Sequence, residues 1–126
     1  MTASPACIAT HRTLADAWSA MQREHVRHLP VLEGGVVVGM ISQRDLGLLG
    51  AQVPGKLADI RVEEAMSSDP YIVSPEAPLR AVVGTMAARR IGAAIIVEAG
   101  DVQGVFTTTD AVIVLRELLE GAVSLA

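Results

Sequence analysis

Two places in the chain carry a hydroxyl residue followed three positions later by an aspartate, a combination that can cap a helix or hold a ligand. Ser42 and Asp45 lie in GMISQRDL, and Thr107 and Asp110 lie in GVFTTTDA. As a capping box, the hydroxyl and the acid satisfy free N–H groups at a helix start. As a ligand site, the same helix start attracts phosphate, and the carboxylate can accept both hydroxyls of a ribose. One pair can serve both purposes, and the pattern leaves both interpretations open.

Two basic residues, Arg27 and His28, come directly before the apolar segment LPVL. An arginine can hold a phosphate with its planar fork and a histidine can add a donor, so this pair is a candidate phosphate site. The alternative is two solvated polar residues ahead of a buried strand. The matching positions upstream of the second hydroxyl–aspartate pair are Gly92 and Ala93. We therefore expect two unequal sites, one for a charged nucleotide and one for a less charged ligand or for none.

The remaining reactive side chains favour binding over catalysis. The histidines His11, His25 and His28 form no HxxxH or Cys/His cluster, so no metal site is expected. Cys7 lies among apolar residues and is expected to act as a small buried hydrophobe. No nucleophile has a paired base, and GxSxG, Walker and dinucleotide-loop motifs are absent from the sequence. We expect no catalytic residue and no enzyme activity.

Composition limits the class of protein. The chain has 126 residues, of which 51% are hydrophobic, and its formal net charge is −4. An acidic chain with one Trp, one Tyr and one Phe lacks the basic face and the stacking rings of a general nucleic-acid binder. Its apolar runs are shorter than the roughly 18 to 20 residues that span a bilayer, and no signal peptide is visible. These features predict a cytoplasmic protein without membrane insertion.

The two hydroxyl–aspartate pairs belong to an internal repeat. One constant shift places Leu14 on Leu79 and Asp45 on Asp110, and it superimposes nine identities over the first 45 positions. In each copy, apolar residues at i, i+3, i+4 and i+7 predict an amphipathic helix that begins at the matching leucine. The eight residues of these two stripes are Leu14, Ala17, Trp18, Met21, Leu79, Val82, Val83 and Met86.

Apolar bursts around glycine turns complete each copy. LPVL and VVVGMIS flank Gly34 and Gly35, and AAIIV and VQGVFTT flank Gly100, which predicts two β-hairpins. We expect an opening strand at ACIA and at YIVS, and a closing helix from about residue 43 and over 108–119. The fold class is α/β (α+β), with βαββα repeats over 1–50 and 62–126 and a linker over 51–61. Because a half of about 60 residues buries its sheet poorly, we expect the two to pack face to face around a pseudo-twofold axis.

In order and spacing, these features resemble a cystathionine-β-synthase (CBS) domain, and the tandem copies resemble a CBS pair, or Bateman module. The resemblance rests on RHLPV, the glycine hairpin, the G-h-h-[ST]-x-x-D ending (h apolar) of both copies, and VEEAMSSDPYIVSP ahead of the second copy. It covers nearly the whole chain. It implies a stand-alone regulatory, signal-sensing protein that needs no cofactor. In its clefts such a pair would reversibly bind an adenosine-containing ligand, for which AMP, ADP, ATP and S-adenosylmethionine are the candidates.

The resemblance also implies roles for single residues. The two motif aspartates would bind ribose, the two motif hydroxyls would lie by phosphate, and the basic pair at Arg27 and His28 would contact phosphate. A further group is expected to line an apolar slot for a purine, with ordinary core as the alternative. Its four residues are Ile8, Pro30, Val73 and Ile95.

The apolar final segment AVIVLRELLEGAVSLA exceeds what its own repeat needs. It is expected either to cap the core or to contact a second subunit, since pairs of this family often form dimers. A homodimer and an unidentified effector protein are therefore the expected partners. The alternative function is a dimerisation or scaffold module that binds no ligand in one or both clefts.

Overall fold

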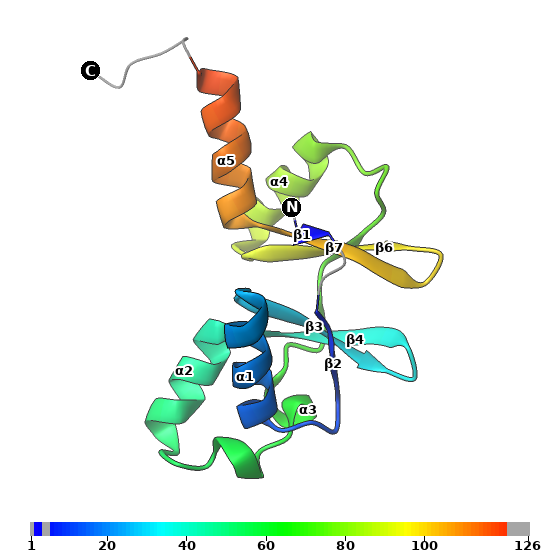
Figure 1. Cartoon of the computed structure of the whole chain (residues 1–126). Coiled ribbons are helices and arrows are strands. Elements are labelled where there is room, and N and C mark those ends of the chain that lie inside the picture. Colours follow the sequence, from blue (N-terminus) through cyan, green and yellow to red (C-terminus); the bar gives the residue numbers. More distant parts are fainter. Residues whose placement is uncertain (1, 4–5, 121–126) are drawn as a thin grey trace, which may run out of the picture.

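The computed structural model describes residues 2–3 and 6–120, which form two similar halves whose sheets face each other. In Figure 1 the helices lie on the outer sides of the two sheets, with the first half below and the second half above. The expected α/β class with two βαββα repeats packed face to face is confirmed.

The first half holds a three-stranded sheet of order β2-β3-β4, in which β2 and β3 are parallel and β3 and β4 antiparallel. Its elements are β2 (Ile8–Ala9), α1 (Leu14–Glu24), β3 (His28–Glu33), β4 (Val36–Ser42) and α2 (Gln43–Gln52). The turn between β3 and β4 places Gly34 and Gly35 at φ values of 57° and 82°. Glycine adopts this left-handed conformation without strain, which explains the predicted hairpin.

The second half repeats this order. Its elements are β5 (Ile72–Val73), α4 (Leu79–Arg89), β6 (Ala93–Glu98), β7 (Asp101–Thr107) and α5 (Thr108–Leu119). The helix α4 and the strands β6 and β7 begin and end at the positions that match the bounds of α1, β3 and β4 in the aligned repeat. The β-bulge between Val31 and Leu32 also recurs, between Ile96 and Val97. The predicted repeat is therefore confirmed down to an irregularity within its strands.

Each half lends a segment to the other. The strand β1 (Thr2–Ala3) comes from the start of the chain, yet it pairs with β7 in a sheet of order β1-β7-β6-β5. After α2, the chain forms η1 (Leu57–Asp59) and α3 (Val62–Ala65) beside the first half. It then crosses to the second half at Ser67, which exchanges two backbone hydrogen bonds with Met40 of β4, at 3.0 and 2.9 Å. Backbone bonds as well as side chains thus hold the halves together.

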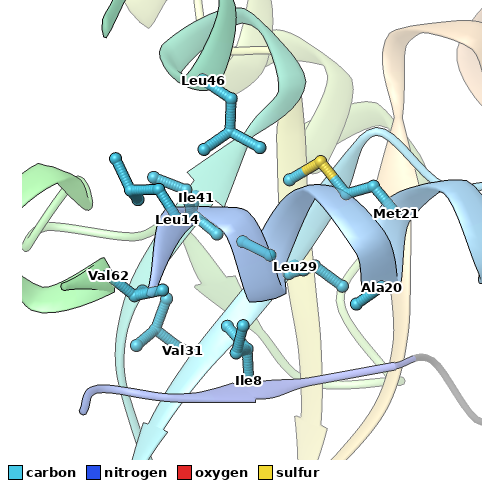
Figure 2. Packing of buried hydrophobic residues seen from close by; sticks show 10 residues of the cluster. Ile8, Leu14, Ala20, Met21, Leu29, Val31, Ile41, Leu46 and Val62 are labelled. Atoms are coloured by element: carbon cyan, nitrogen blue, oxygen red, sulfur yellow. The ribbon is translucent and has the colours of Figure 1, made fainter. Parts of the chain in front are cut away.

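The core of the first half lies between its sheet and its helices (Figure 2). Leu14, Leu29 and Ile41 are fully buried there, and Val62 of α3 closes one side of the cluster. Burial of each such side chain contributes about 1.5–3 kcal/mol. The segment from η1 to α3 therefore packs on the first half, and the domain boundaries expected at residues 51 and 62 remain a prediction.

Two smaller clusters fill the second half and the interface between the halves. The cluster of the second half consists of Val82, Met86, Ala94, Ile96 and Phe106. The interface cluster joins β4 to β6 and β7 and consists of Met40, Ala93, Ile95 and Val105. The interface cluster is the packing between the two sheets, which neither half could form alone.

The predicted helix stripes are only partly buried. Most of their residues lie in the cores, but Trp18 of α1 keeps 41% of its surface exposed, and Leu79 and Val83 of α4 keep 44% and 38%. Sheets of three or four strands are narrow, so each helix covers them with only part of its apolar face. No helix in the described part of the chain is long and apolar enough to cross a membrane.

Candidate functional site

Both hydroxyl–aspartate pairs form complete capping boxes, at the starts of α2 and α5. The Asp45 N–H donates to Ser42 Oγ at 3.1 Å, and Asp45 Oδ2 accepts from the Ser42 N–H and hydroxyl at 2.9 and 2.8 Å. Thr107 and Asp110 make the same three bonds at 3.2, 2.8 and 3.0 Å. The capping interpretation is confirmed at both places. Because the bonds from Ser42 end on Oδ2, capping does not engage the other oxygen of Asp45, and ligand binding stays a prediction.

A cleft of about 570 Å³ opens at the start of α2, and we call it the Asp45 cleft. The first half contributes the start of α2 and the residues that lead into β3. The second half contributes the segment ahead of β5 and the residues that lead into β6. The lining residues are Arg27, His28, Met40, Ser42, Gln43, Arg44, Asp45, Ser67, Asp69, Pro70, Tyr71, Ile91, Gly92 and Ala93. Its volume is within the range of sites for small organic ligands.

A second cleft, of about 350 Å³, opens at the start of α5, and we call it the Asp110 cleft. Here the second half contributes the helix start, and the first half contributes the residues that lead into β3. The lining residues are Ala6, His25, Val26, Arg27, His28, Val105, Thr107, Thr108, Thr109 and Asp110. Sequence reasoning misses the two extra threonines, at positions that the motif leaves variable, and His25, which lies outside the motif.

The alignment of the two repeats also relates the two clefts. Gly92 lies in the Asp45 cleft at the position that corresponds to Arg27 in the Asp110 cleft, and Tyr71 corresponds to Ala6. Each cleft combines the helix start of one half with the strand approach of the other. Both halves are therefore needed to build either cleft.

The basic pair lines the Asp45 cleft, as the sequence suggests, and it lines the Asp110 cleft as well. The sequence associates Arg27 and His28 with the Asp45 motif, and Gly92 and Ala93 with the other motif. In the structure Gly92 and Ala93 line the Asp45 cleft, whereas Arg27 and His28 line both clefts. The reason is that the beginnings of β3 and β6 meet at the interface, so each reaches the helix start of the opposite half. The two clefts do differ in their lining residues. The difference is not that one cleft has the basic pair and the other has Gly92 and Ala93, as the sequence suggests.

His28 lies where the two halves meet. A Cβ atom on Gly92 would lie 3.6 Å from His28 Nε2, so the imidazole fills space beside a residue without a side chain. Burial lowers the pKa of His28, Asp45 opposes this shift, and Arg27 adds to it. The imidazole is therefore mostly neutral at pH 7, with one donor and one acceptor nitrogen.

The carboxyl of Asp110 is ionised at neutral pH. Burial raises its pKa, but hydrogen bonds, among them those from the Thr107 N–H and hydroxyl, outweigh burial, and the pKa lies below its ordinary value. The start of α5 also favours a negative charge at this position. The Asp110 cleft therefore contains a fixed acceptor beside its basic residues.

Among the residues of the Asp45 cleft that sequence reasoning misses are Arg44, Asp69 and Tyr71. Arg44 occupies a variable position of the motif and is exposed beside the cleft. Tyr71 alone is aromatic among the described lining residues of the two clefts. The Arg89 guanidinium lies 5.7 Å from the centre of the Tyr71 ring and 3.5 Å from the Asp69 carboxylate. The sequence does not predict Asp69 and Tyr71, because it does not show that the packing of the two halves brings the residues ahead of β5 to the start of α2.

The four residues expected to line a purine slot lie away from both clefts. Ile8 belongs to the core of the first half, and Pro30 is fully buried. Ile95 is fully buried in the interface cluster, and Val73 lines a separate hollow beside α4. None of the four lines the Asp45 or the Asp110 cleft. Their contact with a purine stays a prediction, and packing is the role for which the structure gives direct observations.

Metal-ligating side chains do not cluster in the described residues, and Cys7 lines neither cleft. No group of three His, Cys, Asp or Glu side chains within residues 2–3 and 6–120 could hold a metal ion. Cys7 is half-buried, and burial raises the pKa of its thiol, which keeps the thiol protonated at neutral pH.

Fold and site together define a class of protein: a tandem pair of βαββα repeats that share a sheet interface and build two clefts between them. The model of the CBS domain family matches residues 1–46 and 62–117. The chain belongs to the CBS domain family, and it contains two copies of that domain.

Individual relatives agree with this assignment. The CBS domain-containing protein YhcV of Bacillus subtilis is 29% identical over 110 residues, which cover 87% of this chain and 78% of YhcV. The solved structure of AcuB from Vibrio cholerae is 30% identical, covers 95% of this chain and 89% of its own, and has a TM-score of 0.79. The CBS pair of protein MJ0100, solved with 5′-methylthioadenosine and S-adenosyl-L-methionine, is 22% identical with a TM-score of 0.77, covering 91% of each chain. The resemblance to the CBS pair is thereby confirmed.

Proposed function

We propose that this CBS pair is a regulatory module that binds an adenosine-containing nucleotide between its repeats and signals by a change in their arrangement. The observation that carries the proposal is the mixed origin of each cleft. A ligand that touches walls from both halves binds best to one separation and orientation of the halves. It therefore shifts the population toward that arrangement, which a partner protein can recognise.

The Asp45 cleft is the better candidate for the main site. Asp45 offers the carboxylate oxygen that capping does not engage to the hydroxyls of a ribose. Tyr71, from the second half, offers a ring on which a purine can stack, an interaction worth about 1–3 kcal/mol per base. Arg27 and Arg44 supply positive charge for a phosphate.

The start of α2 adds a backbone donor to this cleft. Its first N–H group, on Gln43, donates to the Arg27 carbonyl at 2.8 Å. Its third, on Asp45, donates to Ser42 Oγ at 3.1 Å. The second, on Arg44, is the one left for a ligand, and it lies where the helix dipole favours an anion.

The comparison with MJ0100 supports the class of ligand. That protein's CBS pair was solved with two adenosine compounds, and its fold matches this chain over 91% of both lengths. At 22% identity the likeness concerns the fold alone. A fold of this kind can hold adenosine compounds, which makes them the first ligands to test.

A dimerisation module is the second candidate function, and the surface of α4 and α5 favours it. A groove of about 450 Å³ runs between these helices, and apart from Arg80 every residue that lines it is apolar. Val112 and Leu118 in this groove are 64% and 74% exposed. In the first half η1 packs against both helices, but in the described residues no such segment covers α4 and α5. A second copy of the chain can cover this face about a twofold axis.

Sedimentation equilibrium tests the dimer. If the groove is the interface, the unmodified chain sediments as a dimer, and Leu118→Asp shifts it to the monomer. A monomeric unmodified chain, or a dimer that Leu118→Asp leaves intact, contradicts pairing through this face.

Thermal unfolding tests ligand binding. We expect AMP, ADP, ATP, S-adenosylmethionine or NAD to raise Tm, because a ligand at 100 times its Kd stabilises the folded state by about 2.7 kcal/mol. Asp45→Ala should reduce the shift. The matched control is Asp16→Ala, which removes the capping box of α1 outside both clefts and should lower Tm without reducing the shift. If none of these compounds raises Tm, the sensor proposal fails.

A further inference from the structure

Among the described lining residues, only Arg27 and His28 belong to both clefts. We propose that Arg27 binds the phosphate of a nucleotide in either cleft, but in only one at a time. An anionic ligand in one cleft then weakens the binding of an anionic ligand in the other. This inference rests on the proposed function and extends it to the regulation of the two sites by each other.

The backbone of Arg27 is held in place while its side chain is exposed. Its carbonyl accepts from the Gln43 N–H at 2.8 Å, which ties the residue to the start of α2. No ion pair involves its guanidinium in the described part of the chain. A long side chain on a fixed backbone, between two clefts, can turn toward either.

Among the described lining residues, the Asp110 cleft has no second arginine, and the Asp45 cleft has only Arg44 besides Arg27. The residue that corresponds to Arg27 in the repeat is Gly92, which has no side chain to offer the Asp45 cleft. Of the two clefts, Arg44 lines only the Asp45 cleft. In the Asp110 cleft, Arg27 is the one described lining residue with a permanent positive charge. Two phosphates that share one guanidinium compete for it and repel each other.

The His28 imidazole forms the wall that the clefts share. Its Nε2 lies 3.6 Å from where a Cβ of Gly92 would be, so it fills the gap between the two halves at this level. The clefts are thus separate spaces with a common basic edge. Each cleft has a volume of its own, about 570 and 350 Å³, so we expect the coupling to arise from charge.

Calorimetric titration of AMP into single-cleft variants tests whether Arg27 serves both clefts. Asp110→Ala leaves the Asp45 cleft intact, and Asp45→Ala leaves the other. If alanine lowers Tm too far, Asp→Asn replaces it, since the amide oxygen can still accept the capping bonds. We expect Arg27→Ala to weaken AMP binding about tenfold in both backgrounds, the loss of one charge-assisted bond. Adenosine, which has no phosphate, should bind equally well with and without Arg27.

The chain with both clefts intact tests the coupling. We expect its second AMP to bind about tenfold more weakly than AMP binds to the corresponding single-cleft variant. Adenosine should show no such difference. Gly92→Arg adds a second guanidinium at a site where a Cβ meets only ordinary contact, and it should bring the second AMP affinity back.

Three outcomes would overturn the inference. In the first, Arg27→Ala weakens AMP binding in only one of the two single-cleft variants. In the second, one single-cleft variant binds no AMP. In the third, the second AMP binds the intact chain as tightly as AMP binds the single-cleft variant. Independent AMP binding at two clefts overturns this inference alone. If neither AMP nor adenosine binds the intact chain, the proposed function fails with it.

Discussion

The imidazole of His28 reaches across the interface to Gly92, with Nε2 3.6 Å from the position of a Cβ on that glycine. In the aligned repeat Ala93 corresponds to His28 and Arg27 corresponds to Gly92. The equivalent contact would therefore join Ala93 to Arg27, but the alanine side chain is too short to cross the interface. A large side chain from one half therefore meets a small residue of the other. The difference between Arg27–His28 and Gly92–Ala93 is thus a feature of packing as well as of charge.

The first prediction concerns this contact. Gly92→Ala adds a methyl group at ordinary van der Waals distance from His28, on a backbone that alanine can adopt. We expect a change of less than about 1 kcal/mol in the free energy of unfolding, and an unchanged AMP-induced shift in Tm. Denaturant unfolding with and without AMP measures both. A loss of several kcal/mol would mean that the halves are closer here than the structure shows.

Gly39→Ala should behave very differently. A Cβ on Gly39 would lie 2.5 Å from Met66 Sδ and 2.7 Å from the Ser67 carbonyl oxygen, where the chain crosses between the halves. Because the backbone oxygen is held by the bond to Met40, we expect a loss of about 1–3 kcal/mol in stability.

The matched control is Gly47→Ala in α2. A Cβ there meets nothing within 4 Å, and alanine is the better helix residue by about 0.5–1 kcal/mol. Chemical denaturation of both variants compares the same change at two sites. Equal effects would contradict the close crossing at Gly39.

Stability should fall as His28 gains a proton. Burial lowers its pKa, Asp45 on α2 opposes this, and Arg27 beside it adds to it, so the folded state binds a proton less readily than the unfolded state. The folded state keeps its full stability above the ordinary histidine pKa of about 6.5 and loses it as pH falls toward the lowered folded value. We expect the free energy of unfolding to decrease between pH 7 and pH 5, and His28→Gln to remove this decrease. A variant with the same slope as the unmodified chain would refute the assignment.

Asp110 should contribute stability that disappears in acid. Its folded pKa lies below the ordinary value, so its contribution is present above about pH 3.9 and is lost as pH falls through the lowered folded value. Asp110→Asn should therefore be less stable than the unmodified chain at pH 6, and the difference should shrink as pH falls below the ordinary aspartate pKa of about 3.9. Urea unfolding at several pH values measures the difference. A constant difference across this range would show that the charge of Asp110 is not involved.

Much of the fold follows from periodicity. The stripes at Leu14 and Leu79, the glycine turns and the two capping boxes predict elements that the structure contains at matching positions of the two copies. These features depend on residues that are close in the sequence, so the sequence alone can predict them. The partial exposure of Trp18 and Val83 cannot be predicted in this way, because it depends on how wide a sheet each helix covers.

The site is only half predictable for the same reason. Asp45 and Asp110 are found by their motif, but which residues face them depends on how two halves cross in space. Arg44 stands at a position that the motif leaves variable, and Tyr71 lies outside the motif. Gly92 lines the cleft opposite to the one that the repeat suggests. A twofold arrangement exchanges partners between copies, and a linear alignment cannot show that exchange.

The central claim is that one ligand touches both halves, and calorimetric titration of AMP into three chains tests it most directly. Asp45 comes from the first half and Tyr71 from the second, and both line one cleft. Bridging predicts that Asp45→Ala and Tyr71→Ala each weaken AMP binding about tenfold or more relative to the unmodified chain, since each removes a contact worth about 1–3 kcal/mol. If AMP binds the unmodified chain and only one of the two substitutions weakens it, the ligand is held by a single half, and the proposed mechanism is contradicted.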